Sequence, residues 1–219
     1  MPYTPEAPLG SYIDHTNLRP NATAGDIEKL CAEAIEHQLF AVCLNGCWVQ
    51  HAWNHLADTD VSIATVVGFP LGANDSDSKR YETEAAIDNG AHEIDIVMNL
   101  GRFIGGDHRY IIREIRDVIE AADDRRVKVI IETCYFNDEQ IATACKLAVE
   151  AEAHFVKTCT GFSAGGATLE HVQLMRETVG QRAGVKASGG IRDRETALEM
   201  IGAGATRIGT SYGVTIVGV

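Results

Sequence analysis

Two lysines stand within apolar, strand-like runs of the sequence, where a strand that will be buried rarely carries a charged residue. Lys157 lies in HFVKTCTGF and Lys186 in GVKASGGIR, and small or glycine-rich residues follow each of them. A buried ammonium group is costly unless it is paired or gives up its proton. A neutral lysine amine is a nucleophile that forms Schiff bases with carbonyl compounds. The two lysines therefore favour an enzyme that works through a covalent imine.

Asp95 is a third candidate for chemistry, because it stands between Ile94 and Ile96 in a run that otherwise belongs to a core. A buried Lys–Asp pair is one way in which proteins set catalytic pKa values, so we expect Asp95 to pair with a lysine and to relay protons beside the reacting carbon. Lys157 and Lys186 lie on consecutive expected strands, and both burial and a neighbouring like charge lower the pKa of a lysine. We expect these effects to leave one of the two amines neutral and nucleophilic.

The remaining motifs give little support to metal chemistry. His51 and His55 are four residues apart and could chelate a metal, but no carboxylate pattern such as HExxH accompanies them, so we expect a helix surface. The six cysteines include no CxxC pair, and a zinc site is not expected. The expected reaction needs neither a metal nor an organic cofactor.

Composition excludes several classes of partner. The formal charge of −12 argues against binding to nucleic acid or to an anionic membrane surface. No apolar run approaches the ~20 residues of a membrane span, and the N-terminal MPYTPEAPLG lacks the basic and apolar parts of a signal peptide. We expect a cytoplasmic protein with reduced cysteines that acts on a small molecule.

Eight short β-branched runs alternate with helix-period segments, and one begins roughly every 20–35 residues, which is the length of a βα unit. Several of them, such as VSIATVVGF, are continuously apolar, as a parallel sheet buried on both faces requires. The pattern predicts an α/β fold with a single (β/α)8 TIM barrel over residues 1–219. An open doubly wound sheet is the alternative, although no GxGxxG turn follows the first strand. The expected strands are 12–16, 40–44, 62–67, 93–98, 128–132, 154–158, 185–188 and 207–209.

Local signals mark the ends of two helices. Thr23 and Asp26 form a capping box before an amphipathic segment that starts near Ile27. A later helix is expected from about Asp193 to a stop at the glycines of residues 202–204.

The loops after the seventh and eighth strands have the composition of an anion site. Gly189 and Gly190 follow the seventh strand, and Ser211 closes a GTS triplet after the eighth. In barrels of this kind these two loops commonly bind phosphate through backbone N–H groups, and glycine lets the backbone approach the anion closely. The GG and GTS motifs alone are also compatible with ordinary turns. The prediction of a phosphate site therefore depends on their position after the seventh and eighth strands.

With these motifs in order, the chain resembles the deoxyribose-phosphate aldolases over nearly its whole length. The matching blocks are IDHTNL, AVCLN, VVGFPLG, GAHEIDIVMNLG, KVIIETC, FVKTCTGFSAGGAT, VKASGGIR and RIGTS. The resemblance implies a class I aldolase that reversibly cleaves 2-deoxy-D-ribose 5-phosphate to acetaldehyde and D-glyceraldehyde 3-phosphate. It also implies deoxyribonucleotide catabolism as the setting and a homo-oligomer, a dimer or a tetramer.

The resemblance implies roles for individual residues. Lys157 matches the Schiff-base lysine, Lys186 the second lysine that perturbs it, and Asp95 the proton-relay aspartate. Thr160 is expected near the substrate from its place at a strand end. The expected substrate-binding residues are Asp14, Thr16, Thr160, Gly161, Gly189, Gly190 and Ser211.

Three departures from the family pattern leave alternatives open. Cys159 replaces a serine, a glycine follows Asn45 where the family has proline, and Tyr212 puts a bulky side chain beside the expected phosphate loop. A metal-free sugar-phosphate isomerase or synthase would use Asp95 without an imine. A sugar-phosphate-binding protein with a degraded site is the other alternative, and Tyr212 is its motive.

Overall fold

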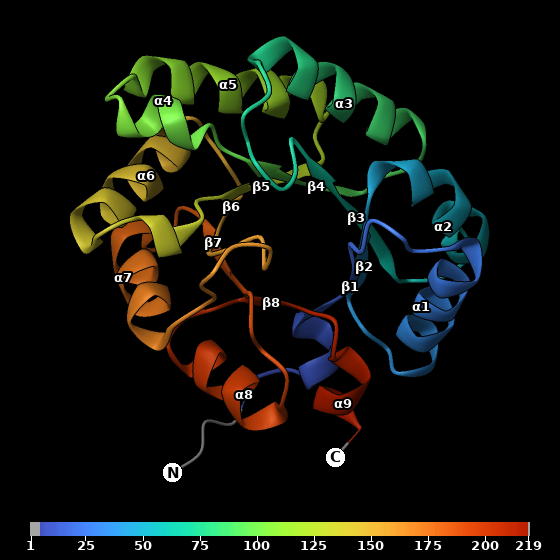
Figure 1. The fold of residues 1–219 in the computed structure, drawn as a ribbon. Coiled ribbons are helices and arrows are strands. Elements are labelled where there is room, and N and C mark those ends of the chain that lie inside the picture. Colours follow the sequence, from blue (N-terminus) through green and yellow to red (C-terminus); the bar gives the residue numbers. More distant parts are fainter. Residues whose placement is uncertain (1–4, 219) are drawn as a thin grey trace.

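The eight apolar runs form eight parallel strands that close into a barrel, with the helices packed around its outside (Figure 1). The structure is a computed structural model that describes residues 5–218. Each strand pairs with the next along the chain and β8 pairs with β1, which excludes the open sheet. The predicted (β/α)8 barrel is confirmed, while the ends of the predicted domain, residues 1 and 219, lie outside the described residues.

The strands are β1 (Ile13–Asn17), β2 (Ala41–Leu44), β3 (Ser62–Val67), β4 (Glu93–Val97), β5 (Arg126–Ile130), β6 (Phe155–Lys157), β7 (Gly184–Ser188) and β8 (Arg207–Thr210). The helices are α1 (Ala24–Glu36), α2 (Val49–Leu56), α3 (Ser76–Asp88), α4 (Leu100–Ile104), α5 (His108–Ala121), α6 (Asp138–Glu150), α7 (Leu169–Val179), α8 (Arg194–Gly202) and α9 (Gly213–Val217). Short 3-10 turns are η1 (Leu9–Tyr12), η2 (Gly46–Trp48) and η3 (Thr133–Tyr135).

Every expected strand overlaps an observed one, and the largest difference falls on β5. The sequence predicts a strand to Glu132, but β5 ends at Ile130. Glu132 has a φ of 60°, in the left-handed region, and a strand residue cannot adopt that conformation. The chain therefore turns into η3 after Ile130, although the apolar residues at this point predicted that the strand would continue.

The predicted helix ends are confirmed. The backbone N–H of Thr23 donates to Asp26 Oδ2 at 2.8 Å, and the N–H of Asp26 donates to Thr23 Oγ1 at 3.4 Å, which completes the capping box of α1. Asp193 caps α8 by accepting from the N–H of Thr196 at 2.8 Å. Side chains thus satisfy N–H groups that the first turn of a helix leaves without partners.

The main apolar core lies between the strands and the helices, and the barrel interior holds an ionic layer beside a small apolar cluster of Leu18, Cys43, Ala64 and Val66. On β4, Ile94 and Ile96 belong to the apolar cluster, whereas Glu93 and Asp95 make ion pairs. Side chains alternate between the two faces of a strand, so one face of β4 meets the helices and the other faces the interior. The same alternation on β6 and β7 explains why lysines stand within apolar runs.

A buried ion pair ties α3 to α5 and to the ends of two strands. Lys79 Nζ donates to Glu114 Oε1 at 2.7 Å and to the carbonyls of Gly72 and Val97, each at 2.9 Å. The second carboxylate oxygen of Glu114 accepts from the N–H of Asn99 at 3.0 Å. Both side chains are fully buried, so this pair holds the loop between β3 and α3 against the end of β4.

The part of the chain that the structure describes contains no helix long and apolar enough to cross a bilayer.

Candidate active site

Asp95 is the centre of the ionic layer inside the barrel. Its Oδ1 accepts from Lys128 Nζ at 2.7 Å. Its Oδ2 accepts from Lys157 Nζ at 2.7 Å and from Lys186 Nζ at 2.8 Å. The three lysines come from β5, β6 and β7, which are neighbours in the barrel. One carboxylate on β4 therefore gathers three ammonium groups from consecutive strands.

A second carboxylate, Asp14 on β1, closes the network on the other side. Its Oδ2 accepts from Lys186 Nζ, and its Oδ1 accepts from Arg207 Nη1 at 2.9 Å. The guanidinium of Arg207 also lies 3.5 Å from the centre of the Phe40 ring, a cation–π contact that suits a buried arginine. Asp14 and Asp95 thus both hold the ammonium group of Lys186.

The electrostatics of the layer follow from these contacts. Burial alone would raise the pKa of Asp95, but Lys128, Lys157 and Lys186 outweigh it and hold that pKa well below the ordinary value. Burial alone would lower the pKa of Lys186, but the carboxylates of Asp14 and Asp95 outweigh it and raise the pKa. The carboxylates near Lys128 likewise raise its pKa despite burial. For Lys186, the expectation that burial and a like charge would lower the pKa is therefore wrong, because it left out Asp14.

Within the ion-paired network around Asp95, buried cations outnumber buried carboxylates. Among the described residues, the buried carboxylates of this network are those of Asp14, Glu93 and Asp95. They pair with four buried cations, which are Lys128, Lys157, Lys186 and Arg207. Loss of one proton from this set would balance the charges. The layer is thus suited to hold one amine in the neutral form.

A pocket of about 250 Å³ opens above the carboxyl ends of the strands, and Lys157 lines it. Lys157 is 3% exposed, whereas Lys186 and Asp95 are fully buried and reach the pocket through Lys157. Among the residues expected to bind substrate, those that line this pocket are Thr16, Thr160, Gly161, Gly189, Gly190 and Ser211.

Asp14 lies elsewhere than expected. It was expected to line the substrate pocket, but it is fully buried and is absent from the pocket wall. The physical reason is the alternation along β1, which turns Asp14 toward Lys186 and Arg207. Its contacts suit a residue that positions Lys186.

The phosphate-loop candidates form one connected surface. Gly189 and Gly190 have φ values of 96° and 84°, a conformation that favours glycine. The N–H of Ala167 donates to the carbonyl of Gly189 at 3.0 Å, so the loop after β6 packs on the loop after β7. Ser211 Oγ donates to the carbonyl of Thr16 at 2.7 Å, which joins the ends of β8 and β1. The hydroxyl proton of Ser211 is therefore already in use.

Sequence reasoning missed Lys128, Glu93 and Arg207 as members of the network. Lys128 stands between Val127 and Val129, which is the same signal that identified Asp95. Lys128 Nζ lies 2.7 Å from Glu93 Oε2, and Arg207 lies 3.1 Å from the same oxygen. Glu93 and Arg207 each open their strand, where a charge commonly marks a strand end exposed to solvent.

Two residues beside the pocket differ in what they contribute. Cys159 is buried, and burial raises the pKa of its thiol to about 11, which suits a packing residue and disfavours the reactive thiolate. Tyr212 is 45% exposed at the pocket rim, with the guanidinium of Arg192 lying 6.0 Å from the centre of its ring. At position 212 the rim thus carries an aromatic ring where the family pattern has a small residue.

Fold and site together define a (β/α)8-barrel enzyme with a buried lysine–carboxylate network that meets a pocket through Lys157. A family model described as DeoC/LacD family aldolase matches residues 10–217. The chain belongs to this family of aldolases.

The relatives with known names agree with this assignment. The chain is 54% identical over 209 residues to a deoxyribose-phosphate aldolase of Brevibacillus brevis, covering 95% of each chain. It is 53% identical over 213 residues to one of Thermococcus gammatolerans, again covering 95% of each chain. The solved structure of the Aeropyrum pernix deoxyribose phosphate aldolase, described as a unique tetramer, superposes with a TM-score of 0.90 at 31% identity, covering 96% of this chain and 89% of that one.

Proposed function

We propose that this protein reversibly cleaves 2-deoxy-D-ribose 5-phosphate to acetaldehyde and D-glyceraldehyde 3-phosphate through a Schiff base on Lys157. The observation that carries the proposal is the position of Lys157. Its Nζ lies 2.7 Å from Asp95, and its side chain lines the pocket, as that of no other lysine in residues 5–218 does. Relatives named as deoxyribose-phosphate aldolases, more than half identical to this chain, support the choice of substrate.

The first step needs an amine without its proton. The carboxylate partners of Lys128 and Lys186 raise the pKa of both, so these two lysines stay charged. Lys157 contacts one carboxylate and shares it with both of them, which makes it the amine available to react. Its lone pair attacks C1 of the open-chain sugar, and the carbonyl oxygen takes up a proton. Loss of water from the carbinolamine then gives a protonated imine.

The second step uses the protonated imine as an electron acceptor. A base removes the proton of the C3 hydroxyl, and the electron pair of the C2–C3 bond moves toward the iminium. D-glyceraldehyde 3-phosphate leaves, and an enamine stays on Lys157. We assign the base to a water molecule held by Asp95 and Lys186, whose side chains lie 2.8 Å apart. Protonation of the enamine at C2 and hydrolysis of the imine then release acetaldehyde and regenerate the amine.

The phosphate would bind at the loops after β7 and β8. Gly189 and Gly190 line the pocket with backbone that carries no side chain, and the guanidinium groups of Arg19 and Arg192 border the same space. Glycine backbone and cationic side chains are the usual partners of a phosphate. Thr16, Thr160, Gly161 and Ser211 would contact the sugar or the phosphate from the remaining wall.

Borohydride trapping with acetaldehyde tests the covalent step directly. We expect a two-carbon adduct on the peptide that contains Lys157, detected by intact mass and peptide mapping, and no adduct at that peptide in Lys157→Ala. Lys146→Ala removes an exposed lysine of α6 and should leave the adduct at Lys157 unchanged. Folded protein without the adduct would favour the isomerase or binding alternatives.

We also propose that the protein works in the cytoplasm as a homo-oligomer, a dimer or a tetramer. The six cysteines are unpaired in the structure, and two of them are exposed, which suits a reducing compartment. Light scattering coupled to gel filtration would give the mass of the particle, and a monomer at micromolar concentration would contradict the assembly.

A further inference from the structure

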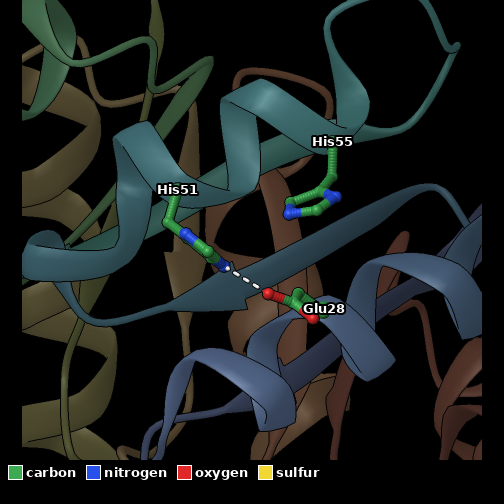
Figure 2. A group of neighbouring side chains, drawn as sticks. All are labelled: Glu28, His51 and His55. Carbon is green, nitrogen blue, oxygen red and sulfur yellow. Dashed lines mark ion pairs between the residues drawn. The ribbon is translucent and has the colours of Figure 1, made fainter.

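Two histidines and one glutamate gather on the outer surface of the barrel, where α1 and α2 lie side by side. Figure 2 shows His51 and His55 extending from α2 toward Glu28, which extends from α1. Ligand-type atoms of the three side chains, one from each, all lie within 4.8 Å of one another. None of these three residues lines the proposed substrate pocket.

The helices bring this group together for a simple reason. Residues four apart lie on the same face of an α-helix, so His51 and His55 are neighbours, with ring centres 5.1 Å apart. Val49, Ala52 and Leu56 of α2 are buried in the apolar core, which fixes the orientation of the helix. The histidine pair is consequently presented to α1, where Glu28 supplies the carboxylate that the HExxH pattern would place within the same helix.

The contact between Glu28 and His51 does not include a hydrogen bond. His51 Nε2 is buried and has no hydrogen-bond partner among the described residues, although Glu28 Oε1 lies 3.4 Å away. Buried ring nitrogens in folded proteins are normally partnered. A ligand atom placed between the two side chains would give this nitrogen its partner.

The spacing fits a metal ion. Tetrahedral zinc with ligand bonds of about 2.0–2.1 Å has ligand atoms about 3.3–3.4 Å apart along each edge. The separation of 3.4 Å between His51 Nε2 and Glu28 Oε1 matches such an edge, and rotation of the exposed His55 ring can bring a third ligand onto the same ion. Two imidazoles with one carboxylate select zinc, nickel or copper over magnesium and calcium, which prefer oxygen ligands.

We propose that Glu28, His51 and His55 bind a divalent transition-metal ion such as Zn²⁺, with water completing the coordination. The ion cross-links α1 and α2 and stabilises the folded state, because it binds the folded arrangement of the three ligands. It takes no part in the aldol cleavage. The strongly negative net charge of −12 also favours cation binding over the surface.

Metal titration of tag-free, chelator-treated protein tests this site. We expect Zn²⁺ or Ni²⁺ at 100 times its dissociation constant to raise Tm by about 5–10 °C. Loss of a residue that only hydrogen-bonds to a metal ligand weakens metal binding by about 10–100-fold. His55→Ala and Glu28→Gln each remove a ligand itself, so each should weaken binding by more than this. His108→Ala, which removes an exposed histidine of α5, should bind the metal as the parent does.

Cu²⁺ electron paramagnetic resonance provides a readout that does not depend on stability. We expect coupling to two nitrogens in the parent protein and to one in His55→Ala. The exposed Cys47 lies just before α2 and offers a competing thiolate, so Cys47→Ser is the second control. Unchanged binding in the His51→Ala/His55→Ala double variant, or loss of binding in Cys47→Ser alone, would overturn the proposal.

Discussion

At the scale of single residues, Asp95 has the largest share of the site's electrostatics, since three ammonium groups contact its two oxygens. Replacing Asp95 by Asn keeps the shape and removes the charge. We expect kcat to fall by about 10²–10⁴-fold, the usual worth of general acid–base assistance. Steady-state kinetics with 2-deoxy-D-ribose 5-phosphate would measure this. Activity of Asp95→Asn within threefold of the parent would contradict the proposed relay.

Tyr212 lies at the rim of the pocket, beside the proposed phosphate loop. Tyr212 borders the pocket next to Ser211. A serine placed at position 212 could donate a hydrogen bond to a phosphate oxygen. We expect Tyr212→Ser to lower KM for 2-deoxy-D-ribose 5-phosphate by about 10–150-fold, since a hydrogen bond to a charged group contributes roughly 1.5–3 kcal/mol. Unphosphorylated 2-deoxy-D-ribose is the control substrate. An equal change for both sugars would show that Tyr212 acts on pocket shape alone.

At the scale of elements, the ion pair between Lys79 of α3 and Glu114 of α5 is a fully buried polar link between helices. Glu114→Ala would leave a buried ammonium without its carboxylate, which typically costs about 3–5 kcal/mol of unfolding free energy. For a chain of this length we expect Tm to fall by roughly 6–20 °C. Differential scanning calorimetry would measure the fall.

A matched control lies on the same helix. Arg80 and Glu84 of α3 form an exposed pair at 3.8 Å, and exposed pairs contribute at most about 1 kcal/mol. Glu84→Ala should therefore leave Tm within a few degrees of the parent. Equal losses in the two variants would refute the distinction between buried and exposed pairs in this protein.

At the scale of the whole molecule, the buried ionic layer makes stability depend on pH at both extremes. Burial alone would raise the pKa values of Asp14 and Asp95, but their cationic neighbours outweigh burial, so both pKa values are lowered in the folded state. Their contribution is present above the unfolded value of about 3.9 and is lost as pH falls through the folded value. The pKa of Lys186 is raised, so its contribution is present below about 10.4 and is lost as pH rises through the folded value.

We therefore expect a broad plateau of unfolding free energy between about pH 5 and pH 9, with a decline below about pH 4. Urea unfolding across this range would measure it. Asp14→Asn should lower the plateau and make the acid decline shallower, because one of the responsible carboxylates is gone. An acid decline of unchanged slope in Asp14→Asn would show that other carboxylates govern it.

Comparison of sequence and structure shows which features are local. The strand runs, the capping box of Thr23 and the stop of α8 are encoded in contiguous residues, and the structure confirms them. Charged residues within apolar runs pointed to Lys157, Lys186 and Asp95, which the structure brings into contact. Lys128 carried the same signal on the strand that follows that of Asp95, and it was missed although the predicted barrel places these two strands side by side.

By itself, then, the sequence determined the order of the elements, the barrel class and the candidates for chemistry, because periodicity and capping act over neighbouring residues. Only the tertiary structure decided how the charges are shared. It turns Asp14 away from the pocket and toward Lys186, and it sets Glu28 beside His51. These pairings join residues far apart in the chain, and their distances depend on barrel closure and helix packing, which no local pattern encodes.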